Sequence, residues 1–194
     1  MDVNELAILL DGAEETANLE FKGPMDWSAA GIARDILAMA NTIDGGRLVF
    51  GVEDGSFDQV GLTEEQFATF EPEEMQDQVE PFADPGVAFA VSKITTDDGK
   101  RFVVVEVFPF TESPIICRKD KGDLSAGAIY IRPRTGRPKS RKIASSAEMR
   151  DLIDRAIAVN LDRFRRIGLL ADHDNAGSDV EFQDQFDAEA KDVL

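Results

Sequence analysis

The sequence predicts an α+β fold, with a mixed, largely antiparallel sheet and helices packed on its faces. Three observations lead to this prediction. Helix and strand patterns alternate over the first half, and several strands and a closing helix follow them. The continuous apolar run at residues 48–52 is typical of a strand covered on both faces. Two further apolar runs, at residues 87–94 and 101–108, flank an Asp-Gly pair and indicate a β-hairpin.

The first predicted element is a short helix over residues 3–11, where apolar side chains recur at helical spacing. Residues 19–22 are expected to form a strand, which the following Gly-Pro pair ends. Ser28 is a candidate N-cap for a helix that runs to about Thr42. The apolar positions of that helix form a single stripe, so one of its faces is expected to be buried.

Capping boxes at residues 63–66 and 145–148 predict two further helix starts, and Pro72 suits the first turn of another helix. Strands are expected at residues 115–118 and 128–132, around a polar loop. The closing helix is expected to place its apolar residues on an inner face: Met149, Leu152, Ile153, Ala156, Ile157, Leu161 and Phe164. We expect one domain over residues 1–170 and an acidic, mobile tail over residues 171–194.

Composition excludes several classes of protein. Cys117 is the only cysteine and His173 the only histidine, so an internal disulfide and a Cys/His zinc cluster are excluded. No apolar run approaches the roughly 20 residues that cross a bilayer. The acidic N-terminus lacks the basic start of a secretory signal. We therefore expect a cytoplasmic protein with no membrane partner.

The charge is unevenly distributed along the chain, whose net charge is -17. Residues 117–142 hold nine Lys or Arg against two acids, a net +7, whereas residues 171–194 hold eight acids against one Lys, a net -7. A concentrated basic segment can bind a polyanion locally because salt screens each patch beyond about 8–10 Å. The simpler interpretation is a solvated loop that balances an acidic surface.

Five motifs follow one another in order over roughly residues 14–155. They are the acidic approach Glu-Glu-Thr-Ala-Asn at 14–18, Leu-Glu-Phe-Lys at 19–22, the run Ile-Leu-Ala-Met-Ala-Asn-Thr-Ile-Asp-Gly-Gly at 36–46, the strand ending in acids at 48–54, and Gly-Ala-Ile-Tyr-Ile-Arg at 127–132. Together they resemble the Schlafen AlbA-like domain, a domain assigned to DNA binding that is found in many bacterial regulators. The sequence departs from that family by one extra residue in the turn and by Pro133-Arg134-Thr135 before Gly136. The zinc site of animal Schlafens has no counterpart here.

The resemblance implies binding of RNA or DNA, often in transcriptional regulation. It also implies a homodimer, because two-lobed relatives carry two copies of the domain. Some Schlafen members cleave RNA through three acids, which correspond here to Glu15, Glu20 and Asp54. An endoribonuclease of this kind would need Mg²⁺ or Mn²⁺, for which Glu20 and Asp54 are the candidate ligands. The alternative is that these acids are solvated loop residues, so the sequence leaves enzymatic activity open.

Phosphate contact is expected from the Pro- and Gly-interrupted basic segment, through Arg132, Arg134, Arg137, Lys139, Arg141 and Lys142. The polar residues of the turn, Asn41 and Thr42, are interpreted as structural groups that bond the last carbonyls of the preceding helix. The leading hypothesis is therefore a nucleic-acid-binding module. The alternative is a regulatory or protein-interaction module whose basic segment binds an acidic partner or the chain's own tail.

Overall fold

The computed structural model describes residues 1–11, 14–133 and 138–170. By its contacts the chain divides into two compact units, residues 1–156 and residues 157–194. The acidic tail predicted over residues 171–194 lies outside the described residues, so its mobility stays a prediction. No helix in the described ranges is both long enough and apolar enough to cross a membrane.

The first unit is built on a mixed sheet of four strands in the order β1-β2-β5-β4. Strands β1 and β2 run parallel, while β2–β5 and β5–β4 are antiparallel, which confirms the predicted α+β class. The strands are β1 (Leu19–Lys22), β2 (Gly46–Phe50), β4 (Phe89–Thr95) and β5 (Arg101–Val107). Strands β4 and β5 are the predicted hairpin, and β1 has the predicted bounds.

The remaining strands form two short two-stranded sheets. β3 (Ala83–Asp84) pairs with β6 (Ile116–Cys117), and β7 (Tyr130–Ile131) pairs with β8 (Arg141–Lys142), both antiparallel. Neither β3 nor β8 was predicted. A strand of two residues is too short to show the alternation by which a strand is recognised in a sequence.

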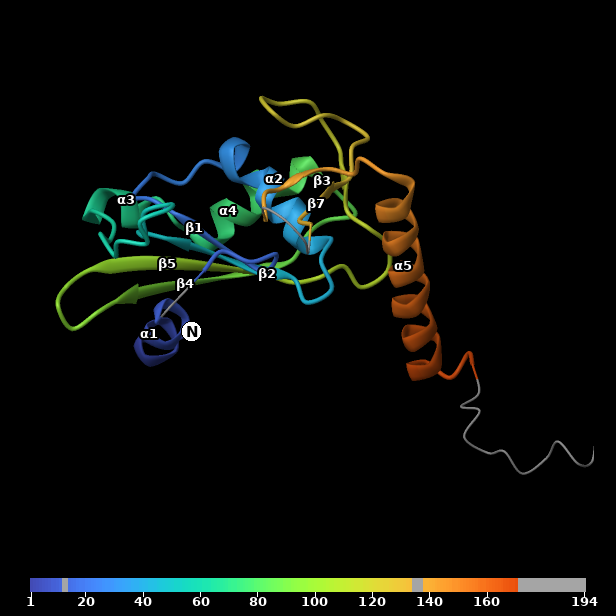
Figure 1. Ribbon diagram of the computed structural model, residues 1–194, viewed down its shortest axis with the longest axis horizontal. Helices are drawn as coiled ribbons and strands as arrows, with labels where there is room; N and C mark the ends of the chain where they lie inside the picture. The colour runs from blue at the N-terminus through green and yellow to red at the C-terminus, as the bar shows by residue number, and fades with distance from the viewer. Residues whose placement is uncertain (12–13, 134–137, 171–194) are drawn as a thin grey trace, which may run out of the picture. The chain divides into compact units, whose positions relative to one another are not determined.

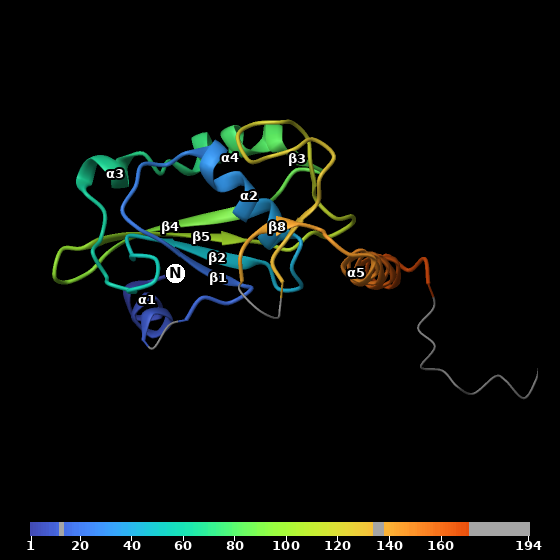
Figure 2. The same ribbon diagram turned by 45° about the horizontal axis from the view of Figure 1, so that its top comes forward.

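Helices cover both faces of the sheet (Figures 1 and 2). α1 (Val3–Leu10) lies on one face, where Leu6 packs into a cluster that includes Phe21 and Val49. The other face carries α2 (Ala29–Ala40), α3 (Glu64–Ala68), α4 (Pro72–Val79) and the 3-10 turn η1 (Glu80–Phe82). Because side chains alternate along a strand, β2 sends Val49 to the α1 face and Leu48 to the opposite face. Both are fully buried, as the continuous apolar run predicts.

Local signals account for the helix starts. The Thr63 hydroxyl accepts a hydrogen bond from the Gln66 amide at 3.2 Å, and the Gln66 side chain accepts one from the Thr63 amide, which is the predicted capping box. Pro72 is the first residue of α4. Ser28 is the N-cap of α2 by position, but its hydroxyl makes no capping hydrogen bond.

Helix α5 (Ser146–Arg166) begins at the predicted capping box but does not have the predicted inner face. Within its described residues only Leu152 is buried, whereas Ile153, Ile157, Leu161 and Phe164 are exposed. The prediction was wrong for these four residues. Helical spacing identifies an apolar stripe, but it does not show whether the chain itself supplies a surface to cover that stripe.

Candidate nucleic-acid interface

Arg132 is a buried anchor rather than a surface cation. Its side chain is 0% exposed, and its guanidinium donates to the Glu20 carboxylate. The same group also donates to the backbone carbonyls of Thr16 at 2.9 Å and Ala17 at 3.0 Å. A guanidinium can satisfy so many acceptors because its five N–H donors form a rigid fork. Arg132 therefore ties the end of β7 to β1 and to the segment before it.

Glu20 belongs to a network of alternating charges. Its second partner is the Lys22 ammonium, which lies 2.8 Å from the carboxylate of Asp35 on α2. Glu20 and Lys22 are two residues apart on β1, so they share one face while Phe21 faces the opposite core. Burial alone would lower the pKa of Lys22, but the attraction of Asp35 and Glu20, with hydrogen bonds to both, outweighs it and raises the pKa.

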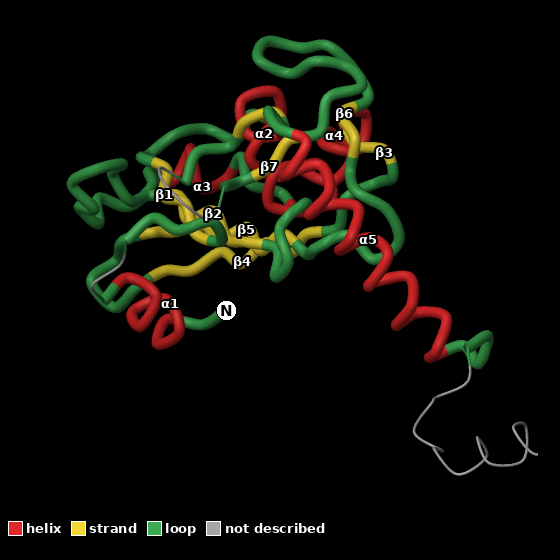
Figure 3. Tube along the Cα trace, turned by 45° about the vertical axis from the view of Figure 1, so that its right-hand side comes forward, coloured by secondary structure: helices red, strands yellow, loops and turns green. Residues whose placement is uncertain are grey.

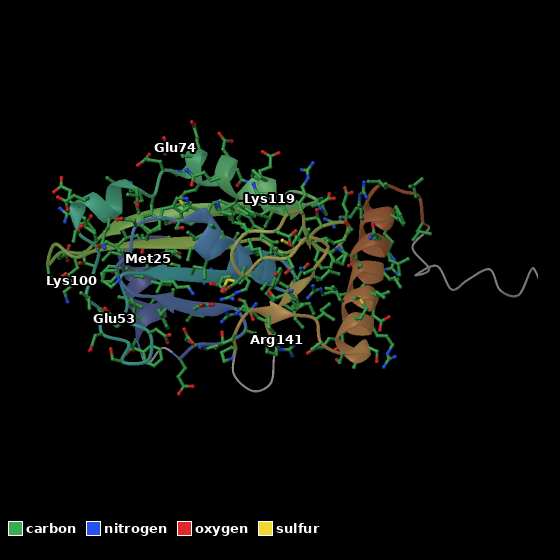
Figure 4. The ribbon with its side chains drawn as sticks, turned by 90° about the horizontal axis from the view of Figure 1, so that it is seen from above. Met25, Glu53, Glu74, Lys100, Lys119 and Arg141 are labelled. Carbon is green, nitrogen blue, oxygen red and sulfur yellow. The ribbon has the colours of Figure 1, made fainter. Side chains whose placement is uncertain are left out.

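The three acids of the predicted catalytic triad occupy different environments. Glu15 accepts a hydrogen bond from the Phe21 amide at 3.3 Å, and Glu20 is held by its two cations. Asp54 is exposed in the turn that follows β2, whereas Glu20 pairs with Leu48 in the middle of that strand. Glu53, the neighbour of Asp54, lies away from Arg141 in Figure 4.

The residues present do not fit the divalent cation that the family resemblance implied. Within the described ranges, no group of three or more His, Cys, Asp or Glu side chains is placed to hold a metal ion. Both oxygens of Glu20 already accept from cationic side chains, which a metal ion would have to displace. We therefore derive no metal-dependent step, and catalysis by Glu15, Glu20 and Asp54 stays a prediction.

The predicted phosphate-contact residues separate into three groups. Arg134 and Arg137 lie outside the described residues. Arg132 is buried, and Arg141 is paired with Glu148 on α5, so neither presents its charge freely to a ligand. The remaining two, Lys139 and Lys142, are exposed. The segment is therefore partly an internal brace and partly a charged surface.

A second basic stretch extends this surface. The loop between β6 and β7, which projects at the top of Figure 3, carries exposed cations at positions 118, 119 and 121. The Lys142 ammonium donates to the Ser125 hydroxyl of this loop at 2.7 Å, and Lys142 pairs with Tyr130 in the β7–β8 register. The loop thus contacts β8 at Ser125, whereas Lys119 nearer its start lies apart from Arg141 in Figure 4. We call this surface the cationic edge; its members are Arg118, Lys119, Lys121, Lys139 and Lys142.

The loop cations contribute to the net +7 of residues 117–142 but were not part of the predicted site. The contact of their loop with Lys142 depends on β8, whose two residues gave no sequence signal. Lys119 also lies over the Phe82 ring, with its ammonium 4.8 Å from the ring centroid. That contact fixes one end of the cationic edge against η1.

The Asn41–Gly46 turn has the structural role that the sequence predicted. The Asn41 side chain donates to the carbonyls of Ile115 at 2.8 Å and Tyr130 at 3.0 Å, and accepts from the Ile115 amide at 2.8 Å. The partners of Asn41 are thus the residue before β6 and a residue of β7 rather than the last helix carbonyls, whereas the Thr42 hydroxyl donates to the Met39 carbonyl as predicted. Gly45 has φ of +68°, and a Cβ there would lie 2.0 Å from the Val107 carbonyl oxygen, so only glycine fits.

A cleft of about 1060 Å³ lies beside this turn. Its walls include Asp44, Asp151 and Asp154, and its cations are already engaged: Arg132 with Glu20, and Arg155 with the Asn41 carbonyl. The guanidinium of Arg155 also lies 4.7 Å from the centroid of the Phe110 ring. The excess of acids makes this cleft unfavourable for a phosphate backbone, in contrast to the cationic edge.

The chain was compared with known proteins. The profile of the family described as "Schlafen, AlbA_2" matches residues 15–141. The crystal structure of the DIP2311 protein from Corynebacterium diphtheriae is 15% identical, with a TM-score of 0.52 over 79% of this chain and 32% of that protein. This chain thus spans about a third of that protein's length, and the likeness shows the fold alone.

A second solved structure is the N-terminal domain of a putative ATP-dependent DNA helicase RecG-related protein from Nitrosomonas europaea. It is 21% identical, with a TM-score of 0.45 over 75% of this chain and 96% of that domain. The search of curated proteins gave no match. The family profile covers well over half of the sequence, and its match confirms the resemblance inferred from the ordered motifs. The chain belongs to the Schlafen AlbA_2 family.

Proposed function

We propose that this chain is a nucleic-acid-binding module that contacts phosphate groups through its cationic edge. Membership of the Schlafen AlbA_2 family suggests a nucleic-acid-related function. The observation that supports this placement is that the loop carrying exposed cations contacts β8 through Ser125 and Lys142, in a protein whose net charge is -17. An acidic chain that gathers exposed lysines on one edge has a surface suited to a polyanion.

The chemistry of the edge favours the backbone of a nucleic acid over its bases. Lysine ammonium groups bind phosphate as point charges, and each neutralised phosphate releases condensed counterions. Reading a base requires hydrogen-bonding groups placed in a groove, and the cationic edge consists of flexible side chains on short strands and a loop. The expected binding is therefore strongly dependent on salt and weakly dependent on sequence.

The proposal is tested by removing charge at two separate places on the surface. The test variant combines Lys119→Gln, Lys121→Gln and Lys139→Gln. The matched control combines Lys93→Gln, Lys100→Gln and Arg101→Gln, which removes the same charge elsewhere; Lys100 and Lys119 lie well apart in Figure 4. Fluorescence anisotropy with a labelled duplex and a labelled RNA hairpin should show weaker binding for the test variant and little change for the control.

An equal loss of affinity in both variants would show that net charge, rather than the cationic edge, controls binding. Unchanged affinity in the test variant would show that the cationic edge is not part of the nucleic-acid interface. Deletion of residues 171–194 addresses the alternative function, because a net -7 tail bound to the basic segment would compete with nucleic acid. Tighter binding after the deletion would favour that alternative.

RNA cleavage through the three acids is a finer proposal that rests on the motif match alone, because the described residues do not fit a divalent cation. The informative variant is Asp54→Asn rather than Glu20→Gln, because Asp54 is exposed and Glu20 holds buried cations. If the acids act in catalysis, RNA cutting with Mg²⁺ or Mn²⁺ should disappear in Asp54→Asn while its melting temperature stays unchanged. RNA cleavage that persists in Asp54→Asn would show that Asp54 is not a catalytic residue.

A further inference from the structure

Helix α5 carries an apolar stripe that the described part of the chain does not cover. Ile153, Ile157, Leu161 and Phe164 are 48%, 53%, 40% and 36% exposed. At 100° per residue, their steps of four, four and three residues place them in an arc of about 80° on one side of the helix. Four large apolar side chains in such an arc are the usual pattern of a helix that pairs with another helix.

The charges beside the stripe identify the partner that fits. Asp154 and Arg165 lie on the same flank of the stripe, near opposite ends of the helix, at about 100° and 120° from Ile153. The exposed Arg165 forms an exposed ion pair with Asp162 at 3.1 Å, and such a pair can be exchanged for another at little cost. In an antiparallel pair, each Asp154 would face Arg165 of the second copy. In a parallel pair this flank would face the other flank of the second copy, so Asp154 and Arg165 would not meet.

We infer that α5 forms the interface of a homodimer, in which two copies of the helix pair antiparallel through this stripe. Ile157 then packs against Phe164 of the second copy, and the two-fold axis passes near Asn160. The interface is self-complementary, as a two-fold dimer requires, because one helix supplies both halves of every contact. This inference does not depend on the nucleic-acid proposal.

The oligomeric state tests the interface. Sedimentation equilibrium of the full chain should show a dimer that dissociates at lower concentration. The variant Ile157→Glu with Phe164→Glu should be monomeric at every concentration, whereas the matched control Ala158→Glu, about 100° away from Ile157, should remain dimeric. Circular dichroism should show that all three proteins are folded, because the changed residues are exposed. A monomeric native chain, or a stripe variant that still dimerises, would overturn the inference.

The orientation is tested by charge exchange and by crosslinking. Asp154→Arg or Arg165→Asp alone should weaken the dimer, and the two together should restore it. Cys117 is the chain's only cysteine and is 1% exposed. Disulfides between copies should therefore come from an introduced cysteine, with little crosslinking through Cys117. Asn160→Cys should form a disulfide between copies, because it lies near the two-fold axis. Ile153→Cys should not form a disulfide, because in an antiparallel pair position 153 of one helix lies about 22 Å along the axis from position 153 of the other.

Efficient crosslinking through Ile153→Cys would indicate a parallel pair and would overturn the proposed orientation. The chain's own tail is the competing occupant of the stripe. If the native chain is monomeric and dimerises only after residues 171–194 are deleted, the tail covers the stripe in the full chain and the inference is wrong.

Discussion

Replacing Glu20 with Gln should destabilise the protein, because it leaves a buried guanidinium without its counter-charge. The side chain of Arg132 is 0% exposed and that of Glu20 is 14% exposed, so water replaces the lost interaction poorly. Breaking one side of a buried ion pair costs about 3–5 kcal/mol. Arg132 keeps its backbone carbonyl acceptors and Lys22 keeps Asp35, so we expect the lower end, about 3 kcal/mol.

For a chain of this length, each kcal/mol corresponds to about 2–4 °C, so the melting temperature should fall by about 6–12 °C. Urea unfolding followed by circular dichroism measures the free energy directly. The control Asp54→Asn removes an exposed carboxylate and should change the unfolding free energy by less than about 0.5 kcal/mol. A change below about 1 kcal/mol in Glu20→Gln would show that the pair behaves as a surface ion pair, which would refute the reasoning.

A double-mutant cycle separates the ion pair from the loss of Glu20 alone. If Glu20 mainly neutralises Arg132, the variant that combines Glu20→Gln with Arg132→Met should be less destabilised than the sum of the two single changes. Additive effects would show that the two side chains stabilise the fold independently.

Two further predictions concern the turn and the last helix. Asn41→Ala leaves the buried partner groups of Ile115 and the Tyr130 carbonyl without hydrogen bonds, so urea unfolding should show a loss of about 2–4 kcal/mol; a loss below about 1 kcal/mol would contradict this role. Hydrogen bonding from Arg141 lowers the pKa of Glu148 to about 2, so its stabilising effect is complete above pH 4.5 and is lost as the pH falls towards 2. The difference in unfolding free energy between the native chain and Glu148→Gln should therefore shrink between about pH 5 and about pH 2.5, and a constant difference would oppose this.

Local signals in the sequence predicted most of the sheet and the helix starts. The bounds of β1, the β4–β5 hairpin and both capping boxes follow from residues within a few positions of each other. The α5 stripe was also visible, but its assignment to the core was wrong. Amphipathic spacing is the same whether a helix face is covered by its own domain or by another molecule.

The site was harder to predict because its interactions join residues distant in the sequence. Glu20 was selected as a metal ligand and Arg132 as a phosphate contact, yet the two neutralise each other across 112 positions. A list of charged residues does not show which opposite charges pair inside the fold. The cationic edge depends in the same way on β8, whose two residues bring Lys142 beside Ser125.

The dependence of nucleic-acid affinity on salt tests the central claim most directly. For a duplex, each phosphate that a lysine neutralises contributes about 0.9 to the slope of log K against log salt concentration. The variant with Lys119→Gln, Lys121→Gln and Lys139→Gln should therefore have a slope shallower than the native chain by about 2–3. The control at Lys93, Lys100 and Arg101 should keep the native slope. Equal slopes in the native chain and the test variant would contradict the proposal that the cationic edge holds the phosphates.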